Sequence, residues 1–233
     1  MANTAVVYGR DYQQQTLNFE ASGGLIKGSL IMQDQETDTY WSIMTGEAIA
    51  GKMHKTKLAE LPVSEKMQWK DWVKKYPNTA VLSVDGEEES PVDYYSNYFK
   101  SEQGFRKLKA KDKRLRTKEP IFAFQYENRK IAIPHSAFWG GKAFDIGGES
   151  VFLFRSPTDA IFASTKAFIA PANTFKKQNE QWIETSSQHF FDAKSGKFTG
   201  NKSENESPKP LNGFDTFWYN WSLTNKETEV IKK

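Results

Sequence analysis

The stretch from residue 40 to residue 83, YWSIMTGEAIAGKMHKTKLAELPVSEKMQWKDWVKKYPNTAVLS, decides the fold. It holds three of the seven tryptophans, a Thr-Gly-Glu turn and a helical pattern. The spacing i, i+3, i+4 and i+7 predicts a helix over residues 65–76, with an apolar face made of Trp69, Trp72, Val73 and Tyr76. Ser64 is placed to cap the start of this helix, and Pro77 ends it.

The same pattern returns near the C-terminus. It predicts a second helix, with Asn212 as a possible cap and an apolar face made of Phe214, Phe217, Trp218 and Trp221. Trp69, Trp72, Thr79 and Val81 are each followed 149 residues later by a similar residue, namely Trp218, Trp221, Thr228 and Val230. Upstream, residues 4–7 match residues 159–162. We therefore predict two pseudo-repeated units, each ending in a W-x-x-W helix.

Composition favours a mainly β protein with a few short helices. Aromatic residues make up 14% of the 233 residues, which is typical of strand-rich proteins. Residues 121–126 and 129–134 flank Glu127-Asn128 and predict a tight hairpin. Further strands are expected at residues 4–8, 16–20, 25–33, 39–43, 79–84, 150–154, 160–164, 166–170, 181–185 and 228–231.

Several function classes are disfavoured by what the sequence lacks. No run of 18 apolar residues exists, so no membrane span is expected. Cysteine is absent, which excludes disulfides, thiolate metal sites and a thiol nucleophile. No signal peptide is visible in this chain. No Ser-His-Asp pattern with a G-x-S-x-G elbow, phosphate loop or dinucleotide fingerprint occurs, so the sequence leans away from an enzyme and predicts no cofactor.

The residues also resemble a known family. The segment SGGLIKGSLIMQDQETDTYWSIMTGEAIAGK, then LAELPV and WKDWVKKYPNTAVLS, is similar to the family called domain of unknown function 3179 (DUF3179). Later segments, including RKIAIPHSAF, DIGGESVFLF and FWYNWSLTNKETEV, follow in the family's order. The resemblance implies no established reaction. Members usually carry a C-P-x-C-type motif before the strand that TAVVY matches, and are often exported; this chain lacks that segment.

The turn after the first tryptophan of the stretch is the first candidate ligand site. A glycine turn beside hydroxyl, carboxylate and indole groups can hold a polar ligand, and a purely structural turn is the alternative. This candidate site consists of Trp41, Ser42, Thr45, Gly46 and Glu47. It has no counterpart in the second unit, so a repeated fold does not require it.

His135 and Asp145 form the second candidate, beside the glycine pair at 140–141. A histidine at a strand end can act as a base or a metal ligand. However, His54, His135 and His189 lack metal-ligand spacing, so no metal site is predicted. A buried, hydrogen-bonded structural histidine is the alternative.

The basic run RKLKAKDKRLRTK, residues 106–118, is the third candidate, for nucleic acid. Only Phe105 is close enough to stack on bases, and the acidic run 85–93 precedes it. A solvated connector is favoured, and nucleic acid binding is not.

The expected organisation is a first, incomplete unit at 1–84, a charged connector at 85–118 and a second unit at 119–233, in one compact body. The favoured function is a non-enzymatic binding or structural module with a protein or small-molecule ligand.

Overall fold

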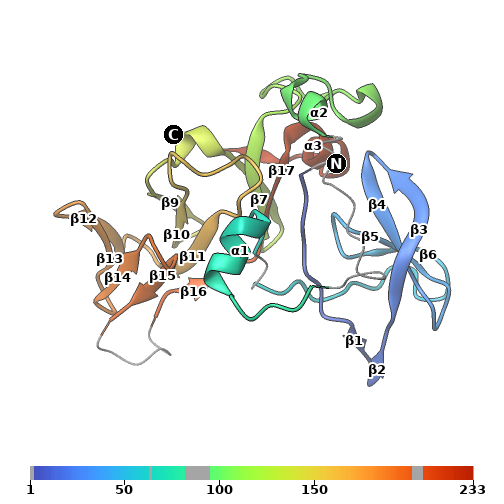
Figure 1. Cartoon of the computed structure of the whole chain (residues 1–233), viewed down its shortest axis with the longest axis horizontal. Helices are drawn as coiled ribbons and strands as arrows, with labels where there is room; N and C mark the ends of the chain where they lie inside the picture. The colour runs from blue at the N-terminus through green and yellow to red at the C-terminus, as the bar shows by residue number, and fades with distance from the viewer. Residues whose placement is uncertain (1–2, 63–64, 82–94, 201–206, 233) are drawn as a thin grey trace.

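A computed structural model describes residues 3–62, 65–81, 95–200 and 207–232. Strands make up 40% and helices 12% of the protein, which confirms the predicted mainly β fold. Figure 1 shows one small sheet at each side of the molecule, with further sheets and the helices between them.

The region predicted as the first unit, residues 1–84, contains a β-meander in the order β3-β4-β5-β6. Its core holds Leu17, Trp41, Ala48 and Leu58. A short hairpin of two two-residue strands, β1 and β2, precedes the meander, and helix α1 follows the meander. The bounds are β1 Asp11–Tyr12, β2 Gln15–Thr16, β3 Phe19–Ile26, β4 Ser29–Asp34, β5 Tyr40–Ser42, β6 Ala48–Ala50 and α1 Trp69–Lys75.

The region predicted as the second unit, residues 119–233, contains three four-stranded sheets, in the orders β17-β7-β8-β18, β16-β11-β10-β9 and β12-β13-β14-β15. The bounds are β7 Pro120–Tyr126, β8 Arg129–Pro134, β9 Lys142–Ile146, β10 Glu149–Phe154, β11 Lys166–Pro171, β12 Phe175–Gln178, β13 Gln181–Glu184, β14 His189–Asp192, β15 Lys197–Thr199, β16 Lys209–Pro210, β17 Phe214–Phe217, α3 Trp218–Thr224 and β18 Glu229–Val230. The short helices are α2 Ser96–Lys100, η1 Phe105–Lys107 and η2 His135–Ala137.

Alternation along the strands builds these layers. On β7, Ile121 and Ala123 pack in the cluster that contains α3, whereas Phe122 and Phe124 pack against β9 and β10. On β10, Phe152 faces the opposite way, into the core under the β12–β15 sheet. Successive side chains of a strand point to opposite faces, so β7 and β10 each join two layers.

The predicted hairpin is confirmed: Glu127 and Asn128 connect β7 to β8, and Glu127 has a positive φ of 51°. The first helix begins at Trp69 instead of residue 65, and Gln68, without a side-chain hydrogen bond, is its N-cap. Ser64 and residues 82–94, where the cap, a strand end and the acidic run were predicted, lie outside the described residues.

The prediction for the second helix was wrong over its first half. Phe214–Phe217 form strand β17, which pairs with β7, and the helix begins at Trp218. All four residues of β17, F-D-T-F, are buried because layers cover both faces. Its two phenylalanines are three residues apart, and this spacing mimics a helical pattern. Asn212 is not a cap, since its amide donates to Glu60 O. Residues 4–8 and 160–164 are also not strands, apart from an isolated bridge at Tyr8.

Candidate functional site

The Trp41 turn is part of the first unit's core. Trp41 is fully buried, and its indole donates a hydrogen bond to Asp34 Oδ2 at 2.8 Å. Burial alone would raise the pKa of Asp34, but hydrogen bonds from Trp41 and Thr37 hold that pKa below its usual value. The indole therefore already has a partner inside the protein.

The remaining turn residues are also satisfied within the chain. Ser42 Oγ accepts from the Met44 amide, and Thr45 Oγ1 accepts from the Glu47 amide. Gly46, at φ 69°, lies under Tyr8, whose ring would be 2.7 Å from a β-carbon added there. Glu47 alone is exposed. Gly46 is thus required by the close approach of Tyr8, which accounts for the turn without a ligand.

His135 and Asp145 are not brought to this turn or to each other. His135 is buried and its Nε2 lies 2.7 Å from Asp215 Oδ1. Asp145 is exposed on β9 and accepts from Ser150 Oγ at 3.2 Å. The described contacts link neither residue to Trp41 or Glu47, so a ligand site shared by these residues stays a prediction.

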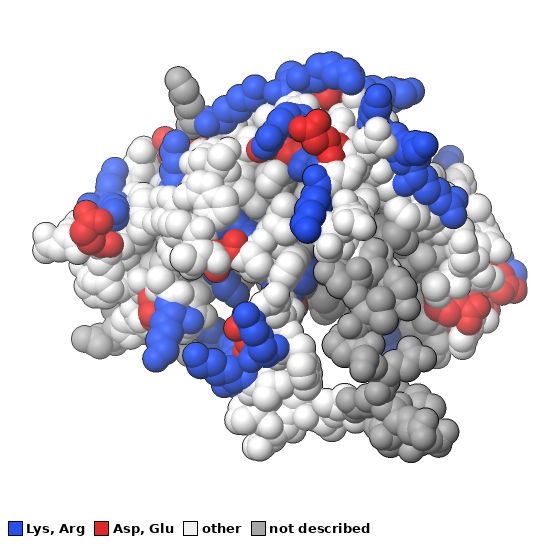
Figure 2. Space-filling model, turned by 45° about the horizontal axis from the view of Figure 1, so that its top comes forward, with Lys and Arg blue, Asp and Glu red and all other residues white. Residues whose placement is uncertain are grey.

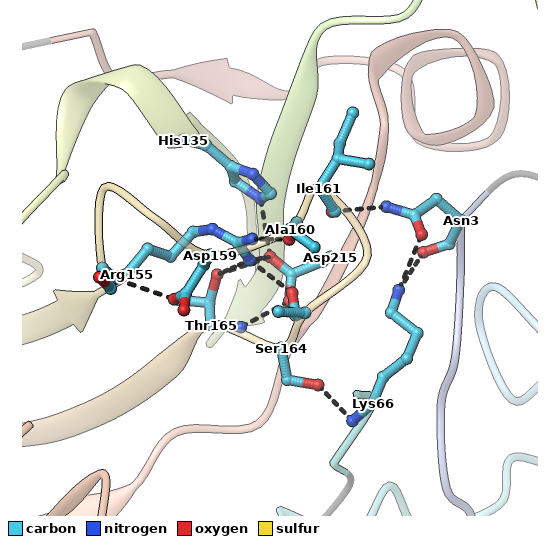
Figure 3. Close-up of polar contacts among 12 residues, drawn as sticks. Asn3, Lys66, His135, Arg155, Asp159, Ala160, Ile161, Ser164, Thr165 and Asp215 are labelled. Carbon is cyan, nitrogen blue, oxygen red and sulfur yellow. Dashed lines mark hydrogen bonds and ion pairs between the residues drawn. The ribbon is translucent and has the colours of Figure 1, made fainter. Parts of the chain in front are cut away.

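A buried carboxylate, that of Asp215, organises the polar cluster shown in Figure 3. Its Oδ2 accepts from the Thr165 amide at 2.7 Å, and its Oδ1 accepts from Thr165 Oγ1 at 2.5 Å. Arg155 Nη1 lies 3.4 Å from the same Oδ1. Burial opposes ionisation of Asp215, yet the hydrogen bonds from His135 and Thr165 and the charge of Arg155 keep its pKa low.

Arg155 ties this carboxylate to the loop that follows β10. Its guanidinium is fully buried and donates to Ala163 O at 2.5 Å and to Ala160 O at 2.7 Å. The loop is therefore wrapped around a cation that Asp215 neutralises. A buried ion pair fixes geometry in this way because either partner alone would carry an uncompensated charge.

Lys66 links the N-terminal part of the chain to the loop that Arg155 holds. Its Nζ donates to Asn3 O at 2.6 Å and to Asn3 Oδ1 at 3.1 Å, while Asn3 Nδ2 donates to Ile161 O. The backbones of Lys66 and Ser164 are linked as well, since Ser164 N donates to Lys66 O at 3.0 Å. Burial lowers the pKa of the Lys66 ammonium to about 8.

Lys66 and Asp215 are 149 residues apart, which is the repeat offset. Both residues line one small cavity, of about 20 Å³. Such a volume accommodates about one water molecule. The other lining residues are Ala5, Phe122, Ser164, Thr165, Gly213 and Phe214. The cavity therefore lies where the N-terminal segment, the residues before α1 and strand β17 meet.

The family model described as "Protein of unknown function (DUF3179)" matches residues 1–228. The chain belongs to the DUF3179 family. No curated protein and no solved structure matches it. In this DUF3179 protein, none of the helices in the described part of the chain has the length and apolarity needed to cross a bilayer. Among those residues, no group of three or more His, Cys, Asp or Glu side chains is arranged to hold a metal ion.

The sequence did not identify Asp215, Arg155 or Lys66 as members of a cluster. Arg155 and Asp215 are 60 residues apart, and their contact depends on how β10 and β17 are placed. One signal was available: the repeat aligns Lys66 with Asp215, so oppositely charged residues occupy equivalent positions. In this DUF3179 chain both residues line the same small cavity.

Proposed function

We propose that this DUF3179 protein is a non-enzymatic binding module that holds a protein partner on the exposed aromatic face of α1. We define the α1 face as Trp69, Trp72 and Tyr76. The observation that carries the proposal is the contrast between α1 and α3, two copies of one W-x-x-W helix. Trp218 and Trp221 are 0% and 2% exposed, whereas Trp69 is 55% exposed.

The α1 face lies outside the described core, with Trp69 and Tyr76 exposed and Trp72 partly buried. None of the hydrophobic core clusters formed by the described residues includes Trp69, Trp72 or Tyr76. Tyr76 is 40% exposed, and Val81, just beyond the helix, is 57% exposed. Contiguous exposed apolar surface of this kind marks protein-interaction sites, and tryptophan and tyrosine supply most binding hot spots.

The helix depends on contacts made elsewhere. It has seven residues and no buried side chain, and isolated helices of this length are marginal in water. Glu65 anchors it by ion pairs to Lys75 at 2.7 Å and to Lys166 at 3.0 Å. A partner that covers the α1 face would bury aromatic surface worth about 2 kcal/mol per side chain and stabilise the helix.

The charges around the α1 face favour an acidic partner. Lys70 and Lys74 are exposed beside it, and Asp71 is the acidic residue of the helix. Two copies of this face would bring their lysines together, which disfavours self-association. A partner surface with an apolar patch and acidic residues around it would complement both the aromatic side chains and the lysines of α1.

An enzyme or small-ligand site receives less support. The Trp41 indole and the Ser42 hydroxyl already have hydrogen-bond partners within the protein. The cavity beside Lys66 and Asp215 accommodates about one water molecule. The small-ligand reading of the Trp41 turn therefore rests on the sequence pattern.

The test is site-specific photo-crosslinking in the cells that produce the protein. A photoreactive phenylalanine analogue replaces Trp69, and the matched control carries it at Phe190, an exposed aromatic of β14 in the second unit. We expect an adduct with one polypeptide from position 69 that position 190 does not give. Purified, that polypeptide should bind the Tyr76→Ala variant at least about tenfold more weakly. The same adducts from both positions, or unchanged affinity for Tyr76→Ala, would refute the proposal.

A further inference from the structure

A row of lysines projects from the segment between α2 and β7. Lys107, Lys109, Lys111 and Lys113 are all exposed, whereas Leu108 and Ala110, between them, pack into the core around α3. Alternation of exposed and inward residues is typical of an extended chain laid on a core. Lys109, Lys111 and Lys113 therefore stand on one side of the extended part, and Lys107 lies next to it at the end of η1. We call these four residues the lysine row.

The segment that carries the lysine row is held firmly. Lys118, five residues after the lysine row, donates to the carbonyl oxygens of Tyr98, Phe99 and Ser101 at the end of α2. Its ammonium lies 4.0 Å from the centre of the Tyr98 ring. Lys118 therefore stabilises the fold, and the lysine row lies on the surface of a packed part of the protein.

Further basic residues extend the lysine row. Lys232 donates to Arg114 O at 2.9 Å, and the hairpin tip next to Lys27 lies against Leu108. Residues 95–119 include nine basic and three acidic residues, a net charge of +6, against +3 for the whole protein. Asp112 and Glu119 are ion-paired with Arg114 and Arg116. Figure 2 shows the resulting band of basic side chains along the upper edge of the molecule.

Within the described residues, no acidic side chain pairs with the lysine row. These like charges lie close together, and their mutual repulsion is relieved when an anionic surface supplies the counter-charge. We propose that the lysine row binds the headgroups of anionic phospholipids, so that this edge of the protein rests on a membrane surface.

The shape of the basic band favours a lipid surface over nucleic acid. The band runs along an outer edge of the molecule (Figure 2), where a layer of headgroups can reach it. Binding of single strands depends on aromatic side chains that stack on bases. Phe105, next to the lysine row, is half-buried and lies under the Arg106 guanidinium, 5.4 Å from its ring centre. Lysine is also a point charge, suited to headgroups that present no fixed geometry.

The test is co-sedimentation of the full chain with vesicles of phosphatidylcholine, alone or with about 30% phosphatidylserine or phosphatidylglycerol. The test variant carries Lys→Gln changes at 107, 109, 111 and 113. The matched control carries Lys→Gln at four other exposed lysines, Lys52, Lys55, Lys176 and Lys197. Both variants lose the same net charge, and circular dichroism checks that both are folded.

We expect binding to both kinds of anionic vesicle and none to phosphatidylcholine alone. Each basic residue near the surface contributes about fivefold, so loss of all four lysines should weaken binding about six hundredfold. The control should change less than about threefold, and about 0.5 M salt should release the protein. Absence of binding at about 0.05 M salt would overturn the proposal, as would equal losses in both variants. Tighter, lysine-row-dependent binding to duplex DNA or single-stranded RNA would overturn it in favour of nucleic acid.

Discussion

Trp72 and Trp221 make the same hydrogen bond in two places 149 residues apart. Each indole donates to the hydroxyl of the threonine seven positions later, Thr79 at 2.8 Å and Thr228 at 3.0 Å. Both threonines then donate to the carbonyl three residues before them, at 2.9 and 2.8 Å. The motif is therefore the same local structure in both units, yet one copy lies in the core and the other on the surface.

The Asp215 carboxylate should be the most sensitive polar group of the fold. Asp215→Asn leaves Arg155 buried without its counter-charge, so we expect the free energy of unfolding to fall by about 3–5 kcal/mol. Urea denaturation measures this change. Asp145→Asn, at an exposed carboxylate, is the control and should cost less than about 0.5 kcal/mol. Equal losses in the two variants would show that the cluster does not depend on charge.

Lys66 should make stability depend on pH above neutrality. Burial lowers its pKa to about 8 in the folded protein, against about 10.4 in an unfolded chain. Between these values the unfolded chain holds the proton and the folded protein does not, so stability rises with pH through this window. Other lysines and tyrosines titrate there too, and the wild type must therefore be compared with Lys66→Met.

The comparison takes urea denaturation of both proteins between about pH 7 and about pH 10.5. The difference in unfolding free energy between wild type and Lys66→Met should grow in favour of the wild type as pH rises. The exposed Lys70→Met variant serves as the control and should track the wild type at every pH. A difference that stays constant with pH would show that Lys66 keeps an ordinary pKa.

The indole of Trp41 should matter as a hydrogen-bond donor to a charged group. Trp41→Phe removes the bond to Asp34 Oδ2, and loss of such a bond costs about 1.5–3 kcal/mol. Trp139→Phe, at a 43% exposed side chain, is a suitable comparison and should cost much less. If Trp41→Phe proved as mild as Trp139→Phe in urea denaturation, the indole nitrogen would be free for another role.

The connector between the units should resist separation. Its described part contributes Leu108, Ala110 and Leu115 to the core around α3. We expect limited proteolysis within residues 85–118 to leave the fragments associated in gel filtration. Release of two separately folded fragments would instead support independent domains with boundaries near 84 and 119.

Local features of the fold could be predicted from the sequence. The β7–β8 hairpin follows from Glu127-Asn128 between two apolar runs, and the repeated W-x-x-W motif follows from its fixed offset. Strand β17 was mistaken for helix because burial on both faces removes the period-two signal. The Asp215 cluster could not be predicted, since Lys66, Arg155 and Asp215 meet only after the sheets have assembled.

The most direct measurement is the unfolding free energy of Trp69→Ala and Trp218→Ala, the equivalent first residues of α1 and α3. We predict a loss of about 3–5 kcal/mol for Trp218→Ala, because this side chain is fully buried. Trp69→Ala should cost less than about 1 kcal/mol, because its face is open to a partner. Losses of similar size at both positions would mean that α1 is packed into the core, and would contradict its role as a docking surface.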